Sequence, residues 1–159
     1  MTQRLGGLVL AATLVLAGGA KAAPMTMNGE PALAFAALVG AYSPALTASQ
    51  KHVLSKFLGG QTAFVSSGAT ITFHVNEVHC QLGDVDLTRH SCRITYGAAV
   101  TALNGEEGAD ILANMALAGV MGDGAAGTIH YDVLNVTCTI KVAEVKSPDG
   151  GGASCTYTQ

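Results

Sequence analysis

The sequence predicts an α+β fold in which a tandem helix-strand-strand repeat builds a four-stranded antiparallel sheet, with helices packed on one face and two hairpin disulfides. The segment 70–80 recurs as 128–138, shifted by 58 positions, with matching threonine, isoleucine, valine and cysteine residues. Within each copy apolar and polar residues alternate, as in a strand with one buried face. A second cysteine follows each copy, Cys92 in the first and Cys155 in the second. Isolated hairpins are marginally stable, so we expect the two copies to share one sheet.

The N-terminal segment 1–22 has the three parts of a secretory signal peptide. Arg4 supplies a positive charge, residues 8–16 form an apolar run, and Ala20-Lys21-Ala22 fits a cleavage site. The apolar run is shorter than the ~20 residues that a membrane span needs, and an uncleaved anchor is the alternative. We therefore expect an exported protein, periplasmic or secreted, with no stable membrane span after cleavage.

The composition limits the partners that the mature chain can have. Removing Arg4 and Lys21 from the eight basic residues leaves six against eleven acidic residues, a net charge near −5. A negatively charged surface repels phosphate backbones, which argues against a nucleic-acid partner. Charged residues make up only 12% of the chain, about half the usual fraction. Such a composition indicates a well-buried core, an oligomer or an exposed apolar patch.

Residues 23–30 are expected to be a flexible lead-in to a single α+β domain at 31–159, with repeat 1 at about 45–97 and repeat 2 at about 103–159. The segment 31–42 predicts a short apolar helix, because it has proline in its first turn and large apolar residues at spacings of three and four.

A second helix is predicted to begin near Thr47. Thr47 and Gln50 form a capping box, in which each side chain satisfies the other residue's backbone amide. Two consecutive glycines, Gly59 and Gly60, mark its end.

Both predicted strands change phase at the same place in the repeat. Apolar residues fall on odd numbers up to Val75 and on even numbers from Val78; the second copy changes from odd to even between Val133 and Val136. A period of two cannot change parity without an extra residue. The sequence therefore predicts β-bulges near 76–77 and near 134–135.

Export makes the four cysteines candidates for disulfides. Three pairings are possible, and we favour Cys80–Cys92 with Cys138–Cys155, because repeat symmetry supports it and a turn-rich run at 147–152 begins midway along the second loop. Each bridge closes a loop of about 15 residues and stabilises the fold by about 3 kcal/mol in the chain-entropy model.

The segment 104–121 predicts a third helix, with Asn104 and Glu107 as its capping residues. Its apolar residues cover most of the circumference, a pattern typical of a buried helix. Whether this helix lines a cavity is left open by the sequence.

In element order, export and hairpin-bridging cysteines, the chain resembles the tandem helix-hairpin modules of secreted bacterial β-lactamase inhibitor proteins. The resemblance implies an exported, inhibitor-like binding protein. It rests on no shared motif, so it assigns no functional residue here.

Candidate functional residues gather on the polar face of the predicted sheet. Three of them, His74, His130 and Asp132, could converge on a metal ion if the two copies pair as neighbours. We favour exposed polar residues with no metal and no cofactor, because no HxH or HxxxH spacing is present.

A second group of residues lies near the first disulfide. The predicted hairpin register sets Glu77 and His79 opposite Thr95 and Arg93, which resembles part of an acid-base site. Cross-strand charge pairing explains these residues equally well. No nucleophile or pocket accompanies them in the sequence, so no catalytic residue is assigned. The predicted binding face comprises His74, Glu77, His79, Arg93, Thr95, His130 and Asp132.

These observations favour a small exported, non-enzymatic protein that binds another macromolecule, such as an exported or envelope protein, as an inhibitor-like or envelope-assembly module. One alternative is a small metal-dependent or hydrolytic enzyme that uses His74, His79 or His130. The other is a carrier of an apolar ligand held beside the helix at 104–121.

Overall fold

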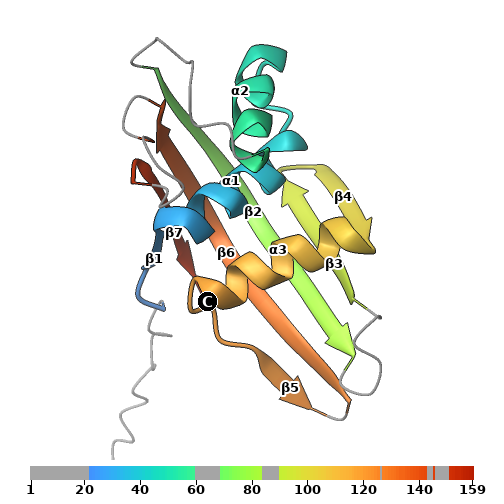
Figure 1. The fold of residues 1–159 in the computed structure, drawn as a ribbon. Helices are drawn as coiled ribbons and strands as arrows, with labels where there is room; N and C mark the ends of the chain where they lie inside the picture. The colour runs from blue at the N-terminus through green and yellow to red at the C-terminus, as the bar shows by residue number, and fades with distance from the viewer. Residues whose placement is uncertain (1–21, 60–68, 84–89, 126, 143–144, 146–150) are drawn as a thin grey trace, which may run out of the picture.

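The structure is a computed structural model that describes residues 22–59, 69–83, 90–125, 127–142, 145 and 151–159 (Figure 1). The predicted signal peptide, apart from residue 22, lies outside these residues. None of the described helices is long and apolar enough to cross a membrane. The elements follow in the order β1 Met25–Asn28, α1 Gly29–Ala41, α2 Ala48–Leu58, β2 Thr70–Gly83, β3 His90–Tyr96, β4 Ala99–Asn104, α3 Glu106–Leu117, β5 Asp123–Ala125, β6 Thr128–Lys141 and β7 Ala153–Thr158.

The α+β class is confirmed, but the sheet has seven described antiparallel strands instead of the predicted four. Its strand order is β1-β7-β6-β2-β3-β4, and β5 pairs with one end of β6. Residues 25–28, expected to be part of a flexible lead-in, form β1 and pair with β7. The sequence signal for β1, β4 and β5 was weak because these strands are short and sit at the sheet margins, where little alternation is required. Figure 1 shows α1 and α3 crossing the same face of the sheet.

The two copies of the repeated segment form the central strand pair. β2 and β6 each have 14 residues and begin 58 positions apart, and they pair along their whole length, from Thr70 opposite Lys141 to Gly83 opposite Thr128. Beyond this pair the predicted repeat is not matched closely. In the described part of the chain, the first copy is followed by β3 and β4, whereas the second is preceded by β5 and followed by β7.

The change of phase occurs where the sequence predicts it. In β2 the buried residues run to Val75 and resume at Val78, and in β6 Val133 and Val136 are buried on either side of the change. β6 shifts its register against β7 between Leu134 and Thr137, as a bulge requires. The register between β2 and β6 stays continuous, because both strands change phase at the same level and the two irregularities cancel.

Both predicted disulfides are present. Cys80 faces Cys92 with an S–S distance of 1.99 Å, and Cys138 faces Cys155 with one of 2.06 Å. All four cysteines are buried at the boundary between sheet and helices. The first bridge lies under α3, where the carbonyl oxygen of Gly108 is 3.2 Å from the Cys92 sulfur. The bridges therefore fix the hairpins on which the helices rest.

The helices begin close to the predicted places, with one correction. α2 has the expected capping box of Thr47 and Gln50. α3 begins at Glu106 behind Gly105 with no side-chain cap, because Asn104 is the last residue of β4 and pairs with Ser91. The expectation that this helix is buried on most sides was wrong: Leu117 is 74% exposed and the residue Met121, beyond its end, is 73% exposed.

Candidate functional site

The helices cover one face of the sheet, and we call the opposite one the outer face. Paired residues on neighbouring antiparallel strands share a face, so the register identifies the side chains that line it. All seven residues of the predicted binding face lie there, on β2, β3 and β6, and none of them is buried. The central part of the outer face includes Thr72, His74, Glu77, His79, Gln81, Arg93, Thr95, His130, Asp132, Leu134, Thr137 and Thr139.

The closest contact on the outer face joins two titratable side chains. Nδ1 of His79 lies 2.5 Å from Oδ1 of Asp132. An ionised carboxylate only accepts hydrogen bonds, so Nδ1 donates and Nε2 remains available. The side chains are 26% and 42% exposed, and the pair is therefore worth at most about 1 kcal/mol of stability.

The change of phase in the central strands creates this contact. His79 follows the change in β2; without it, the side chain would point toward the helices. The continuous register then sets His79 directly opposite Asp132. Sequence reasoning missed this pair although a signal was present. Aligning the phase changes of the two copies places 76 opposite 135, and hence 79 opposite 132.

Two further side chains complete the cluster around His79. Ligand atoms of Glu77, His79 and Asp132 all lie within 4.8 Å of one another. The imidazole of His130 stacks on that of His79, with ring centroids 5.4 Å apart and planes inclined by 30°. Nδ1 of His130 is buried and has no hydrogen-bond partner among the described residues. We call Glu77, His79, His130 and Asp132 the His79 cluster.

The remaining predicted site residues lie outside this cluster. Nδ1 of His74 is 3.3 Å from the hydroxyl of Thr137, so the predicted set of His74, His130 and Asp132 is not the group that the structure assembles. The hairpin register is confirmed, with Arg93 opposite His79 and Thr95 opposite Glu77.

The His79 cluster has part of what an enzyme needs. A carboxylate that orients an imidazole is the general-base half of many hydrolytic sites. Such a site also needs a nucleophile within hydrogen-bond reach and a concave pocket beside it. Among the described residues, the side chain of His79 contacts those of Asp132 and His130, and neither is an activated nucleophile. Nitrogen and carboxylate ligands in one cluster are, by contrast, a set that binds divalent cations.

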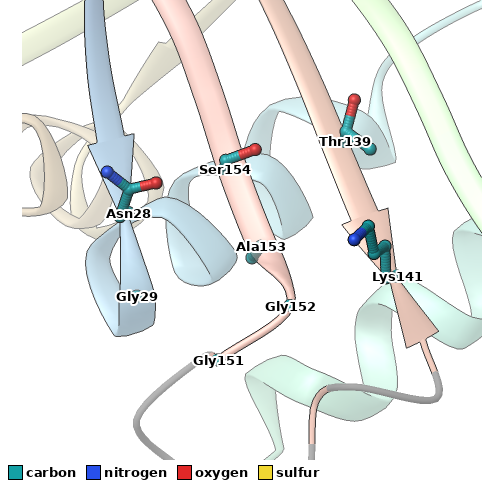
Figure 2. Close-up of a pocket in the computed structure, with 8 residues that line it drawn as sticks. All are labelled: Asn28, Gly29, Thr139, Lys141, Gly151, Gly152, Ala153 and Ser154. Atoms are coloured by element: carbon teal, nitrogen blue, oxygen red, sulfur yellow. The ribbon is translucent and has the colours of Figure 1, made fainter.

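A separate pocket of about 320 Å³ opens where α1 and β7 begin and β6 ends (Figure 2). Thr139 is seven residues from Asp132 along β6, about 23 Å at the usual rise of a strand. The pocket is therefore distinct from the His79 cluster, and its lining includes no residue of the helix proposed for an apolar-ligand carrier. The lining is mostly small and polar: Asn28, Gly29, Thr139, Lys141, Gly151, Gly152, Ala153 and Ser154.

Comparisons with known protein families, with curated proteins and with solved structures find no match to this chain.

Proposed function

We propose that this chain is an exported, non-enzymatic protein that binds an extended segment of another exported protein along β4, the open edge of its sheet. The adjoining part of the outer face contacts the partner's side chains. The observation that carries the proposal is the exposure of β4 at a sheet edge, together with the lack of charged residues and proline in its own sequence.

β4 is the last strand in the sheet order and pairs on one side with β3. Its sequence, AVTALN, contains neither a charged residue nor proline, the residues that usually block pairing with another chain. Val100 is 59% exposed on this strand. The other edge strand, β1, is only four residues long and follows Pro24.

The chemistry of a strand edge indicates the kind of partner. An edge presents a row of backbone N–H and C=O groups, which another polypeptide strand satisfies along its whole length. The partner is therefore a protein segment in extended conformation, which would continue the sheet beyond β4.

The outer face continues directly from this edge. Val100 pairs with Thr95 and Ala102 pairs with Arg93. A strand added to β4 would therefore be separated from these two residues of β3 only by β4 itself. The guanidinium of Arg93 suits a carboxylate of the partner. The Cys80–Cys92 bridge ties β3 to β2, and a rigid surface loses less entropy on binding.

The proposal also includes export of the protein and a role without catalysis. The two disulfides support an oxidising compartment, in agreement with the signal-peptide pattern of residues 1–22. The hydrolytic alternative has one observation in its favour, the hydrogen bond between His79 and Asp132. It also requires a nucleophile and a cleft beside that pair.

The experiment uses mature protein, residues 23–159, immobilised through its C-terminus and exposed to the exported proteins of the source cells. Val100→Lys and Ala102→Lys place a charge on the open edge without disturbing a buried side chain. Thr26→Lys, an exposed position on β1 at the opposite edge, is the matched control. The unmodified protein and the control should capture one stoichiometric partner, and both β4 variants should lose it.

Hydrogen exchange locates the contact. Binding of the partner should slow exchange at the amides of β4 and leave those of β1 unchanged. The proposal is wrong if no stoichiometric partner is captured, or if the β4 variants capture it as well as the control does. A concentration-dependent dimer that the Val100→Lys variant abolishes would identify a second copy of this chain as the occupant and would also overturn the proposal.

A further inference from the structure

We infer that the His79 cluster binds one divalent transition-metal ion, for which zinc is the best-fitting example. The inference goes beyond the proposed function, because it concerns an ion at the centre of the outer face and requires no partner at β4. Two observations carry it. The ligand atoms of Glu77, His79 and Asp132 lie close together, and the buried Nδ1 of His130 has no hydrogen-bond partner among the described residues.

The side chains of Glu77, His79 and Asp132 lie at a spacing compatible with one bound metal ion. Their ligand atoms lie within 4.8 Å of one another, and all three project from the two central strands of the sheet. Glu77 and His79 are two residues apart on β2, which places both on the outer face, and Asp132 reaches them from β6. Because each is only partly buried, an ion can enter from solvent.

His130 is the independent observation. Its Nδ1 is buried without a hydrogen-bond partner among the described residues, although a buried polar atom normally has one. Its ring centroid lies 5.4 Å from that of His79. Two imidazoles on one tetrahedral zinc ion, with Zn–N bonds of about 2.0–2.1 Å, have centroids about 5 Å apart. A rotation of the His130 side chain could thus bring a second nitrogen to the same ion.

Asp132 fits either of two roles in such a site. With its hydrogen bond to Nδ1 retained, it orients His79, whose Nε2 then binds the metal, as carboxylates do in many histidine sites. With the imidazole proton moved to Nε2, both Nδ1 and a carboxylate oxygen become ligands. In both roles the metal site depends on Asp132.

The ligand set determines which ions fit. Imidazole nitrogens and carboxylate oxygens together suit zinc and its neighbours in the first transition series. Calcium and magnesium prefer all-oxygen surroundings. The two carboxylates also balance the charge of a divalent ion. We therefore expect zinc to bind in preference to calcium.

The test titrates zinc chloride into untagged mature protein by calorimetry, with calcium chloride in a parallel titration. One zinc ion should bind per chain. His79→Ala and Asp132→Ala should each weaken zinc binding about tenfold or more. His74→Ala is the matched control, because His74 lies on the same strand and face but pairs with Thr137 outside the cluster, and it should bind zinc as the unmodified protein does.

A spectroscopic measurement separates metal ligation from a general effect on folding. Nitrogen-15 NMR of the histidine rings should show zinc-dependent shifts for His79 and His130 and none for His52. The inference is overturned if zinc does not saturate at one ion per chain, if His79→Ala binds as well as His74→Ala, or if calcium binds equally well.

The outcome can be read separately from that of the proposed function. The Val100→Lys variant retains the whole His79 cluster and should bind zinc normally. Conversely, His79→Ala retains β4 and should still capture the partner. Loss of zinc binding in Val100→Lys would contradict the assignment of the ion to the His79 cluster.

Discussion

Asn76 and Asn135 lie opposite each other at the middle of the central strand pair, between the pairs Val75–Val136 and Glu77–Leu134. Asn135 adopts a left-handed backbone conformation with φ of 51°, and the side-chain oxygen of Asn76 accepts a hydrogen bond of 2.5 Å from the backbone N–H of Gly97. At this level both strands exchange the face on which their apolar residues lie. The change of face at these two asparagines places both His79 and Asp132 on the outer face, where their side chains meet.

The left-handed conformation of Asn135 gives a prediction about stability. Asparagine and glycine tolerate this conformation, whereas a β-branched residue does not. Asn135→Val should lower the free energy of unfolding by about 2 kcal/mol, mostly because valine strains the backbone in this conformation. Asn135→Gly should stay within about 1 kcal/mol of the unmodified protein. Equal unfolding curves in urea for the two variants would show that backbone conformation at this position carries no cost.

Close packing of α1 against α2 and β2 gives a second prediction. A Cβ at Gly40 would stand 2.7 Å from Cδ1 of the buried Leu54 and 3.2 Å from the ring of Phe73. Gly40→Ala should therefore destabilise the protein by about 1–3 kcal/mol through overpacking. Gly59→Ala is the control, because its Cβ would meet only ordinary contacts at 3.6 Å and beyond. Thermal unfolding should separate the two variants, and a Gly40→Ala protein as stable as Gly59→Ala would refute the packing argument.

The buried phenol of Tyr96 makes the fold sensitive to alkali. Its hydroxyl donates a hydrogen bond to the backbone carbonyl of Val39, and burial, followed by the nearby Tyr42, raises the pKa of Tyr96 far above its ordinary range. The folded state therefore holds the phenol proton more tightly than the unfolded state. Its contribution is fully present below about pH 10 and is lost as the pH rises further.

Tyr96→Phe tests this linkage. At neutral pH the variant should lose about 1 kcal/mol with the hydrogen bond. Above about pH 10 its free energy of unfolding should fall less steeply than that of the unmodified protein. The free energy of unfolding of Tyr96→Phe should still fall somewhat above about pH 10. Burial also raises the pKa of Tyr42, with a further contribution from Glu107, and burial raises the pKa of Tyr157. Parallel pH profiles of the two proteins would contradict the assignment to Tyr96.

The Cys138–Cys155 bridge holds β7 against β6, and among the described strands β1 pairs with β7 alone. Replacing both cysteines with alanine should lower the free energy of unfolding by about 3 kcal/mol, the chain-entropy value for a loop of this size. Hydrogen exchange of the variant should accelerate most in β1 and β7. Unchanged exchange in β1 would show that this edge does not depend on the bridge.

Much of the central architecture is predictable from the sequence, because it rests on patterns with a strict period. The alternation in β2 and β6 gives both strands, and the parity change at 76 and 135 gives their irregularity. The disulfides follow from repeat symmetry, and the capping box marks the start of α2 at Thr47.

The margins of the sheet and the composition of the site were harder to predict, because long-range pairing decides them. β1 and β4 are short strands whose residues carry no clear alternation. His79 was assigned to the correct face, but its partner Asp132 is 53 residues away, across a register that the hairpin alone does not define. Exposure of Leu117 was missed because apolar composition does not reveal which side of a helix faces the sheet.

The chain's first strand has its place beside the last one: Met25 pairs with Tyr157, and Asn28 pairs with Ser154. During synthesis β1 therefore cannot pair with β7 until residues 153–158 have been made. Because such distant pairing is slow to form, this margin of the sheet should be completed after the central strands.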